Sequence, residues 1–426
     1  MDASESISVI GLGYVGLPVA LAFSSITEVV AYDTNSARIN ELKAGKDHTG
    51  CLTQTLPSQL LLTNDPKALR TATFHIICVP TPIDKDNQPD LSFLESAAHT
   101  LGPMLHSGDT VVVESTVYPG VTEDIIVPIL ESHSGLKMGS SLRVGYSPER
   151  LSPSDTLHLF ENTVKLVGAN DYQTAELIAE KYRQVVLAGV HMVPSIKVAE
   201  AAKLLENTQR DVNIALVNEM AMLFHALEID SHEVIEAAKT KWNFHPYEPG
   251  LVGGHCIGVD PYYMSAIAQR HGLNPDLVLS ARSRNESMGE YVAQKTIDIL
   301  SDENIPAKAA NVGVFGLSFK ENCPDIRNTK VVGLIQSLEA KGVKTYVADP
   351  IVNKPEFEAT YNIKVLDLEQ LPRLHAIVIA VAHDTFVHCS PTEYLAHLQH
   401  PNLLIDVKGH LDRDRFSDAG VRLWRL

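Results

Sequence analysis

Short runs of apolar and β-branched residues recur along the first 150 positions, and each run ends in polar or turn-forming residues. Runs of this length are typical of buried strands, and the stretches between them suit helices. This alternation predicts a mostly parallel sheet with helices on both faces, in which ligands bind at the carboxyl ends of the strands. The predicted strands are Ile7–Ile10, Val29–Tyr32, Phe74–Val79, Thr110–Val113 and Leu142–Tyr146.

A different pattern follows, in which apolar residues recur at helical spacing from Ser195 to Ile229 without Gly or Pro. We interpret this stretch as a long connecting helix that also offers a dimer surface. After about residue 305 a strand, turn, helix and strand pattern returns, and Gly316 is its one counterpart to the first glycine turn. The predicted elements here are Asn311–Phe315, Thr329–Lys341, Lys344–Val347, Ala376–Val381 and Leu403–Ile405.

The fold class is therefore expected to be α/β, with two Rossmann-like doubly wound domains joined by a long central helix. The expected domain boundaries are 1–194, 195–300 and 301–426.

Composition narrows the possible partners. The 426 residues are 45% hydrophobic and 20% charged, as in ordinary globular proteins, and the formal net charge is −17. Nucleic acid or an anionic membrane surface requires a basic face, so neither is expected as a partner. An anionic ligand would need a local basic island in this acidic protein.

The number and spacing of cysteines and histidines bear on the cellular compartment and on metal binding. The cysteines are five in number and scattered, which argues against a disulfide framework and is simplest in a reducing cytoplasm. The histidines show no H-x-x-x-H or H-E-x-x-H spacing, so no metal site is expected. Residues 1–6 do not look like a signal peptide, and no run of about 18 apolar residues predicts a membrane span.

The first turn has the pattern of a dinucleotide-binding motif. Gly11 permits a tight turn, Gly13 lets the backbone approach a pyrophosphate, and Gly16 permits close packing of helix on strand. Asp33 ends the second strand, where a carboxylate accepts hydrogen bonds from ribose and favours NAD over NADP, and Arg38 is near enough to contact the adenosine side. The motif alone also fits FAD or a purely structural turn.

Cys256 lies in a loop with four glycines in nine residues, Gly250 to Gly258, where backbone approaches a ligand closely. A free thiol is only about 3% ionised at pH 7, so a nucleophilic role needs a nearby positive charge or base. His255 is adjacent, and Asp260 is placed to orient a water or a lysine. From spacing alone, a small buried hydrophobe is the competing interpretation of Cys256.

Further polar residues stand where a site is expected. Lys203 and Asn207 are four residues apart and share one face of the predicted long helix, and Glu149 follows a strand, where a general base would lie. Lys320 and Arg327 flank the second turn and would supply the basic island. Taken singly, each of these residues also fits a solvated surface charge.

Together these motifs resemble the UDP-sugar 6-dehydrogenase family, over nearly the whole chain and in order. The matching segments are Gly11 to Gly16 with Asp33, Pro80-Thr-Pro82, Glu114-Ser-Thr116, Ser147-Pro-Glu-Arg150, Glu200 to Asn207, Gly253-Gly-His-Cys256 with Asp260, and Gly316 to Lys320 followed by Asp325-Ile-Arg327.

The resemblance implies residue roles. Cys256 is similar to the thiol that attacks the C6 aldehyde, Lys203 to a lysine that stabilises oxyanions, and Asp260 to the acid paired with it. Glu149 resembles the base for thioester hydrolysis, and Thr116 and Asn207 resemble a water-holding threonine and an oxyanion-site asparagine. The implied NAD ligands are Gly11, Leu12, Gly13, Tyr14, Val15, Gly16, Asp33, Arg38, Thr81, Thr116 and Arg327. The implied substrate ligands are Glu149, Arg150, Lys203, Asn207, Gly253, Lys320 and, on a looser match, Lys408.

The resemblance also implies an NAD-binding part (1–194), a central part with the cysteine loop and a dimerisation helix (195–300), and a UDP-sugar-binding part (301–426). The implied reaction is a four-electron oxidation by two NAD⁺ in a cytoplasmic homodimer or higher homo-oligomer.

His255, Ile257 and Val259 replace residues typical of UDP-glucose enzymes and resemble the branch that acts on UDP-N-acetylglucosamine or UDP-N-acetylgalactosamine for bacterial surface polysaccharides. UDP-glucose and UDP-N-acetylmannosamine stay open as substrates. A non-catalytic UDP-sugar sensor is disfavoured by Cys256, Lys203 and Asp260, and a two-electron hydroxyacid dehydrogenase is disfavoured because it needs no thiol.

Overall fold

A computed structural model describes residues 6–52, 55–151 and 158–426 and divides the chain into two compact units. Unit 1 comprises Met1–Glu206 and Tyr262–Asn274, and unit 2 comprises Asn207–Pro261 and Pro275–Leu426. The division into three parts, 1–194, 195–300 and 301–426, stays a prediction. Residues 1–6 were expected not to form a signal peptide, and of these only Ser6 lies within the described residues. None of the helices in the described ranges is both long and apolar enough to cross a bilayer.

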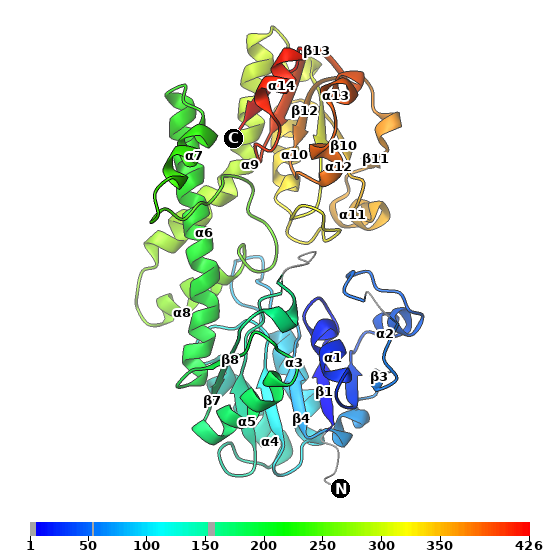
Figure 1. The fold of residues 1–426 in the computed structure, drawn as a ribbon, viewed down its shortest axis with the longest axis vertical. Helices are drawn as coiled ribbons and strands as arrows, with labels where there is room; N and C mark the ends of the chain where they lie inside the picture. Colours follow the sequence, from blue (N-terminus) through cyan, green and yellow to red (C-terminus); the bar gives the residue numbers. More distant parts are fainter. Residues whose placement is uncertain (1–5, 53–54, 152–157) are drawn as a thin grey trace. The chain divides into compact units, whose positions relative to one another are not determined.

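Unit 1 is built on an eight-stranded sheet, within the described ranges, of order β3-β2-β1-β4-β5-β6-β7-β8 (Figure 1). The five predicted strands are confirmed, two with slightly shorter bounds. They are β1 (Ile7–Ile10), β2 (Val29–Tyr32), β4 (Phe74–Ile77), β5 (Thr110–Val113) and β6 (Arg143–Tyr146). Sequence analysis did not identify β3 (Leu60–Thr63), β7 (Lys165–Ala169) and β8 (Val190–Met192).

Every residue of β1, β2, β4 and β5 is buried, which shows that both faces of this part of the sheet are covered by helices. Phe23 and Tyr182, from two different helices, meet edge to face within one core cluster, with ring centroids 5.6 Å apart. The helices are α1 (Gly16–Ser24), α2 (Ser36–Lys43), α3 (Ser92–Leu101), α4 (Val127–Ser134) and α5 (Tyr172–Arg183). Shorter helical turns are Pro66–Thr71, Gly102–Met104, Thr122–Ile126 and Phe160–Asn162.

The sheet of unit 1 contains one reversal of direction. β7 runs antiparallel to β6, with Gly145 opposite Ala169 and Tyr146 opposite Gly168. Continuing this register by three residues on each chain sets Glu149 opposite Lys165. The amino end of β7 therefore lies at the edge where the parallel strands end, which is the edge at which such sheets bind ligands.

Unit 2 contains a parallel sheet of six strands, again within the described ranges, of order β11-β10-β9-β12-β13-β14. Only the last part of β13 was predicted, because Pro401 and Asn402, which has a positive φ, interrupt its apolar pattern. The strands are β9 (Asn311–Phe315), β10 (Lys344–Ala348), β11 (Val365–Leu366), β12 (Leu374–Ile379), β13 (Leu398–Asp406) and β14 (Arg422–Arg425).

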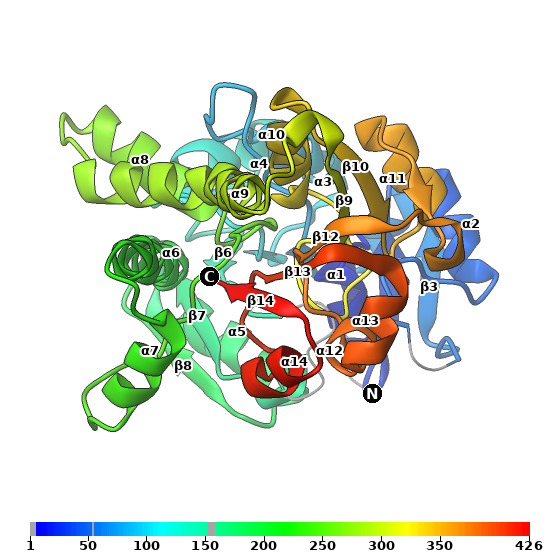
Figure 2. The ribbon, with the colours of Figure 1, turned by 90° about the horizontal axis from the view of Figure 1, so that it is seen from above.

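The predicted long helix is confirmed as α6 (Ile196–Ala226), which contributes residues to both units, as does α8 (Asp260–Arg270). A second long helix, α9 (Asp276–Asp302), was not predicted, and Figure 2 shows α10 (Val331–Ala340) beside it. The remaining helices of unit 2 are α7 (Ser231–Lys239), α11 (Lys354–Tyr361), α12 (Asp384–Val387), α13 (Pro391–His397), α14 (Arg413–Asp418) and the short turns Ala307–Ala309 and Leu368–Gln370. The predicted α/β class with two Rossmann-like parts is confirmed.

The two units repeat one turn in detail. In unit 1 the N–H of Leu12 donates to the Asp33 carboxylate at 2.9 Å, directly after Gly11 with φ +93°. In unit 2 the N–H of Leu317 donates to the Asp349 carboxylate at 2.6 Å, directly after Gly316 with φ +85°. The echo between the halves thus extends beyond the glycine to the acid that ends the neighbouring strand.

We predict that Gly316→Ala destabilises unit 2 by about 1–3 kcal/mol, because φ is positive and a Cβ would lie 2.5 Å from the carbonyl oxygen of Val381. Gly333→Ala is the matched control in α10, where a Cβ meets nothing within 4 Å, and we expect a gain of up to about 1 kcal/mol. Guanidinium unfolding followed by tryptophan fluorescence measures both, since Trp242 and Trp424 lie in unit 2. Equal stabilities for the two variants would contradict the prediction.

Candidate active site

The glycine turn between β1 and α1 has the geometry that a dinucleotide pyrophosphate requires. A Cβ on Gly16 would lie 1.8 Å from the carbonyl oxygen of Gly11, so only glycine lets the helix pack this closely on the strand. At Gly13 a Cβ would meet nothing within 4 Å, which leaves the backbone open to a ligand. Leu12, Tyr14 and Val15 complete this turn, and the residues present therefore fit NAD.

Asp33 and Arg38 brace the turn. Besides the Leu12 N–H, the Asp33 carboxylate accepts the N–H of Asn35 at 2.8 Å, and this half-buried side chain keeps acceptor capacity on both oxygens. Arg38 is 5% exposed and donates its Nε to the carbonyl oxygen of Leu12 at 2.9 Å. Arg38 thus contacts the turn itself, and contact with an adenosine remains a prediction.

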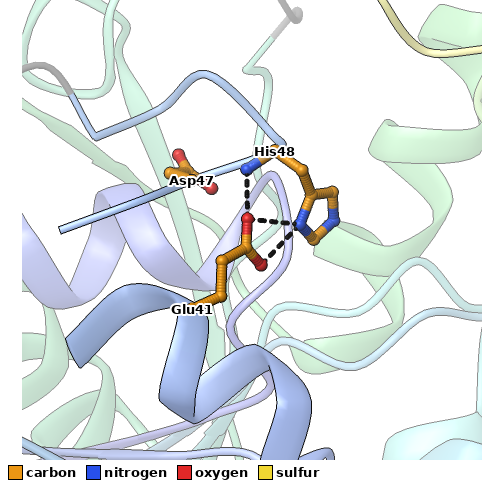
Figure 3. Close-up of side chains that lie close together, drawn as sticks. All are labelled: Glu41, Asp47 and His48. Atoms are coloured by element: carbon orange, nitrogen blue, oxygen red, sulfur yellow. Dashed lines mark hydrogen bonds and ion pairs between the residues drawn. The ribbon is translucent and has the colours of Figure 1, made fainter. Parts of the chain in front are cut away.

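Next to Arg38, three possible metal ligands gather: Glu41, Asp47 and His48 (Figure 3). Their ligand atoms lie within 4.8 Å of one another. However, the Arg38 guanidinium pairs with Asp47 at 2.7 Å and with Glu41 at 3.1 Å, and His48 donates its backbone N–H to Glu41 at 2.6 Å. Since a guanidinium already occupies both carboxylates and repels a second cation, we assign no metal to this cluster.

The other predicted residues of unit 1 follow successive strands of the sheet. Thr81 comes after β4, Thr116 after β5 and Glu149 after β6, and all three strands run in the same direction. The structure therefore brings these residues to one edge, as the sequence analysis predicted. Ser115 ties two of these segments together by donating its hydroxyl to the carbonyl oxygen of Val79 at 2.7 Å.

Glu149 is held by two lysines of unit 1. Lys203, on α6 and 4% exposed, donates its ammonium to the backbone carbonyl of Glu149 at 2.7 Å. Lys165, also buried, donates to the Glu149 carboxylate at 2.6 Å. The neighbouring Arg150 pairs with Glu206. Lys203 and Glu149 are thus buried in contact with each other, which excludes the solvated-surface interpretation for both.

In unit 2 the cysteine loop is clamped at two points. Asn218 of α6 accepts the N–H of Gly250 at 2.8 Å and donates to its carbonyl at 3.1 Å. Asn328 donates its side chain to the carbonyl of Gly254 at 2.8 Å. Cys256 follows both clamped glycines and is exposed, and its carbonyl accepts the N–H of Asp260, the first residue of α8, at 2.8 Å. The exposed thiol excludes the buried-hydrophobe interpretation.

Asp260 and Asn207 lie beside this loop as a buried pair, 1% and 0% exposed, joined by a hydrogen bond from the Asn207 amide to the carboxylate. His255 does not supply the positive charge that the thiol needs. The surrounding protein, and then the charge of Arg327, lower the pKa of His255 to about 4 against the opposing charge of Asp325, so the imidazole is neutral at pH 7.

Only some of the predicted ligand residues of unit 2 line one small cavity in this unit. Gly253 and Lys408 line it, together with Phe319 and Lys330. Lys320 lies in the same turn, whereas Arg327 is half-exposed and forms a two-point ion pair with Asp325. Lys330 and Lys408 at this cavity each lie near a carboxylate, Lys330 at 2.9 Å from Glu286 and Lys408 at 3.9 Å from Glu321, so a basic island formed by Lys320 and Arg327 stays a prediction.

Sequence analysis missed several residues that hold the site. Lys165 was not considered, although a lysine opening an otherwise apolar strand is a recognisable signal. Asn218 and Asn328 carry no comparable signal, because their partners are backbone groups distant in sequence. Glu114 was quoted only as part of a motif.

We predict that Gly13→Ala leaves the melting temperature unchanged and weakens NADH binding at least about ten-fold, because its Cβ takes the space a pyrophosphate needs. Gly16→Ala should lower both quantities, since its Cβ collides with Gly11. NADH fluorescence titration and thermal melting separate the two outcomes. Wild-type NADH affinity in Gly13→Ala would contradict this interpretation of the turn.

Comparison with known proteins gives matches to three successive segments of the chain. Models of the UDP-glucose/GDP-mannose dehydrogenase family match residues 5–186 as the NAD binding domain, 197–287 as the central domain and 313–413 as the UDP binding domain. Protein CapL of Staphylococcus aureus is 44% identical over 425 residues, which cover 99% of this chain and 100% of CapL. The UDP-N-acetyl-D-glucosamine 6-dehydrogenase of Pseudomonas aeruginosa is 42% identical over 412 residues, 96% of this chain and 98% of that protein.

A solved structure of UDP-D-ManNAc dehydrogenase from Pyrococcus horikoshii matches 99% of this chain and 98% of its own, with a TM-score of 0.87 and 30% identity. The expected family, the cofactor NAD and a UDP-binding part are thereby confirmed. The chain belongs to the UDP-glucose/GDP-mannose dehydrogenase family and is an NAD-dependent UDP-sugar dehydrogenase.

Proposed function

We propose that the protein oxidises the C6 hydroxyl of UDP-N-acetylglucosamine or UDP-N-acetylgalactosamine to the uronate, through a thiohemiacetal and a thioester on Cys256. The observation that carries the proposal is the exposed thiol in a loop clamped by Asn218 and Asn328, next to the buried Asp260–Asn207 pair. A thiol is needed because an aldehyde carbon must become tetrahedral before it loses a second hydride.

The residues have distinct roles in this proposal. NAD⁺, bound at the glycine turn, accepts a hydride in each of the two oxidations. The Cys256 sulfur bonds to the aldehyde carbon, and the resulting thioester is cleaved by water, which returns the thiol. Lys203 and Asn207 stabilise the oxygen anion, Asp260 is the acid that acts with them, and Thr116 holds the water. Glu149 accepts the proton of the attacking water.

The names of relatives support an N-acetylated substrate. The proteins from Pseudomonas aeruginosa and Salmonella typhi named UDP-N-acetyl-D-glucosamine 6-dehydrogenase are 42% and 44% identical, against 34% for the UDP-N-acetyl-D-mannosamine dehydrogenase of Pyrococcus horikoshii. We therefore place UDP-N-acetylmannosamine and UDP-glucose second. As part of the same proposal, the enzyme works in the cytoplasm, and its uronate product is used in the synthesis of bacterial surface polysaccharide.

We predict two NADH per UDP-N-acetylglucosamine or UDP-N-acetylgalactosamine consumed, and a lower kcat/KM for UDP-glucose and UDP-N-acetylmannosamine. Cys256→Ala should lower kcat by about 1,000-fold or more, because the second oxidation has no covalent carrier. Cys389→Ala, which removes another partly exposed thiol, is the control and should turn over normally. Absorbance at 340 nm, compared with the sugar consumed, gives the number of NADH molecules formed per sugar. One NADH per sugar, with an aldehyde as the stable product, would contradict the proposal.

We also propose a homodimer or higher homo-oligomer formed through α6. Leu216 and Leu223 are seven residues apart on α6 and share one face, and Leu227 follows directly after the helix; the three are 55%, 47% and 57% exposed. An apolar stripe of this kind on a helix is typical of a surface covered by a second copy.

We predict that the double variant Leu216→Glu/Leu223→Glu sediments as a monomer, whereas Tyr172→Glu, at a 75% exposed position on α5, does not change the mass. Analytical ultracentrifugation measures this directly. An unchanged mass in the double variant would rule out this face of α6 as the interface.

A further inference from the structure

A buried charge cluster in unit 1 surrounds Glu149. Lys165, the first residue of β7, is 3% exposed, and its ammonium lies 2.6 Å from an oxygen of Glu149 and 2.9 Å from an oxygen of Glu114. The same ammonium lies over the rings of Phe160 and Tyr182, 5.2 and 5.1 Å from their centroids. The cation is therefore enclosed, and it is shared by two carboxylates.

Glu149 is fixed from several sides. The oxygen that Lys165 does not contact accepts the N–H of Arg150 at 2.6 Å and the N–H of Leu151 at 3.1 Å. The backbone carbonyl of Glu149 accepts the Lys203 ammonium at 2.7 Å. These contacts leave the carboxylate in one orientation, and Lys165 brings a full positive charge into contact with it.

Glu114 competes for that charge. It is 3% exposed, and its second oxygen accepts the hydroxyl of Tyr182. Burial, together with the charge of Glu149, raises the pKa of Glu114 despite the nearby ammonium. Burial opposes the charge of Lys165, but the two carboxylates outweigh it and raise the pKa of Lys165, so the ammonium persists at neutral pH.

Two further titratable side chains facing the cluster, the Tyr182 hydroxyl and the Cys78 thiol, stay neutral, whereas the Lys203 ammonium lies on the backbone carbonyl of Glu149. Burial, and then the charge of Glu114, raise the pKa values of the Tyr182 hydroxyl and the Cys78 thiol well above their ordinary values. With both carboxylates ionised, Glu114, Glu149 and Lys165 together carry one net negative charge, and a proton taken up by Glu149 makes this group of three neutral. Glu114 then retains the ammonium, so Lys165 keeps its place while Glu149 is neutral.

We propose that Lys165 is a positioning residue for the hydrolysis step, and that Glu114 and Lys165 set the basicity of Glu149 in opposite directions. The inference rests on the proposed function. In that step the oxygen of water bonds to the thioester carbon and its proton goes to Glu149, after which the carbon–sulfur bond breaks and Cys256 leaves as thiolate. The charge of Glu114 favours this proton uptake and the charge of Lys165 opposes it, while the Lys165 contact orients the carboxylate.

Two variants should move the pH dependence of kcat in opposite directions. Glu114→Gln removes a negative charge from beside Glu149, so its carboxylate form persists to lower pH and the acidic limb moves down by about one unit. Lys165→Met removes the cation, so two carboxylates face each other and the acidic limb moves up by about one unit. Lys165→Arg keeps the charge and should return the limb toward the wild-type position.

Intact-mass spectrometry identifies the affected step. On the acidic side, Lys165→Met should accumulate the sugar acyl adduct on Cys256 and still release two NADH per active site in the first turnover. A structural ion pair would instead lower the melting temperature in both variants with no opposed shift of the limbs. If Lys165→Met does not fold, Glu114→Gln still tests the downward shift of the acidic limb, and Lys165→Arg should leave the limb at the wild-type position.

Acidic limbs that stay in place or move in the same direction, in an enzyme whose wild type makes two NADH per sugar, would overturn the inference and leave the proposed function intact. A wild type that makes one NADH per sugar and shows no acyl adduct would overturn the proposed function, and the inference with it.

Discussion

In both units the chain leaves its first strand through a left-handed glycine, and the next backbone N–H is bound by the carboxylate that ends the neighbouring strand. This bond fixes where the following segment starts, because it ties the turn to the edge of the sheet. In unit 1 the sheet is buried on both faces, so its edge is the part left for chemistry.

The same bond serves two purposes. Asp33 is half-buried and retains acceptor capacity, as a ribose ligand must. Asp349 is 3% exposed, and besides the Leu317 N–H it accepts the ring N–H of the buried His383 at 3.0 Å. Burial would raise the pKa of Asp349, but its bond to His383 lowers it, so the carboxylate remains ionised and occupied within the protein.

Much of this was predictable from sequence, because glycine turns and apolar runs are local signals. The strands Ile7–Ile10, Val29–Tyr32, Thr110–Val113 and Asn311–Phe315 were predicted to the residue. The predictable part of the site was the set of residues that follow strands or stand in glycine loops. Contacts between side chains and distant backbone, such as Asn218 with Gly250, were not predictable, because nothing in the local pattern marks the partner. The reversal of β7 was also missed, because this short strand was itself not identified.

That reversal has a consequence for conformational entropy. In a parallel sheet, groups reach the ligand edge from loops after the strands, which lose the most backbone freedom when they are ordered. A strand running the other way presents its first residue at this edge, and the ladder bonds of the sheet have already ordered it. Lys165 is such a residue, since its backbone N–H donates to the carbonyl of Gly189 at 3.1 Å. The sheet therefore orders the backbone of Lys165 before any ligand binds, whereas the neighbouring groups at this edge depend on loops.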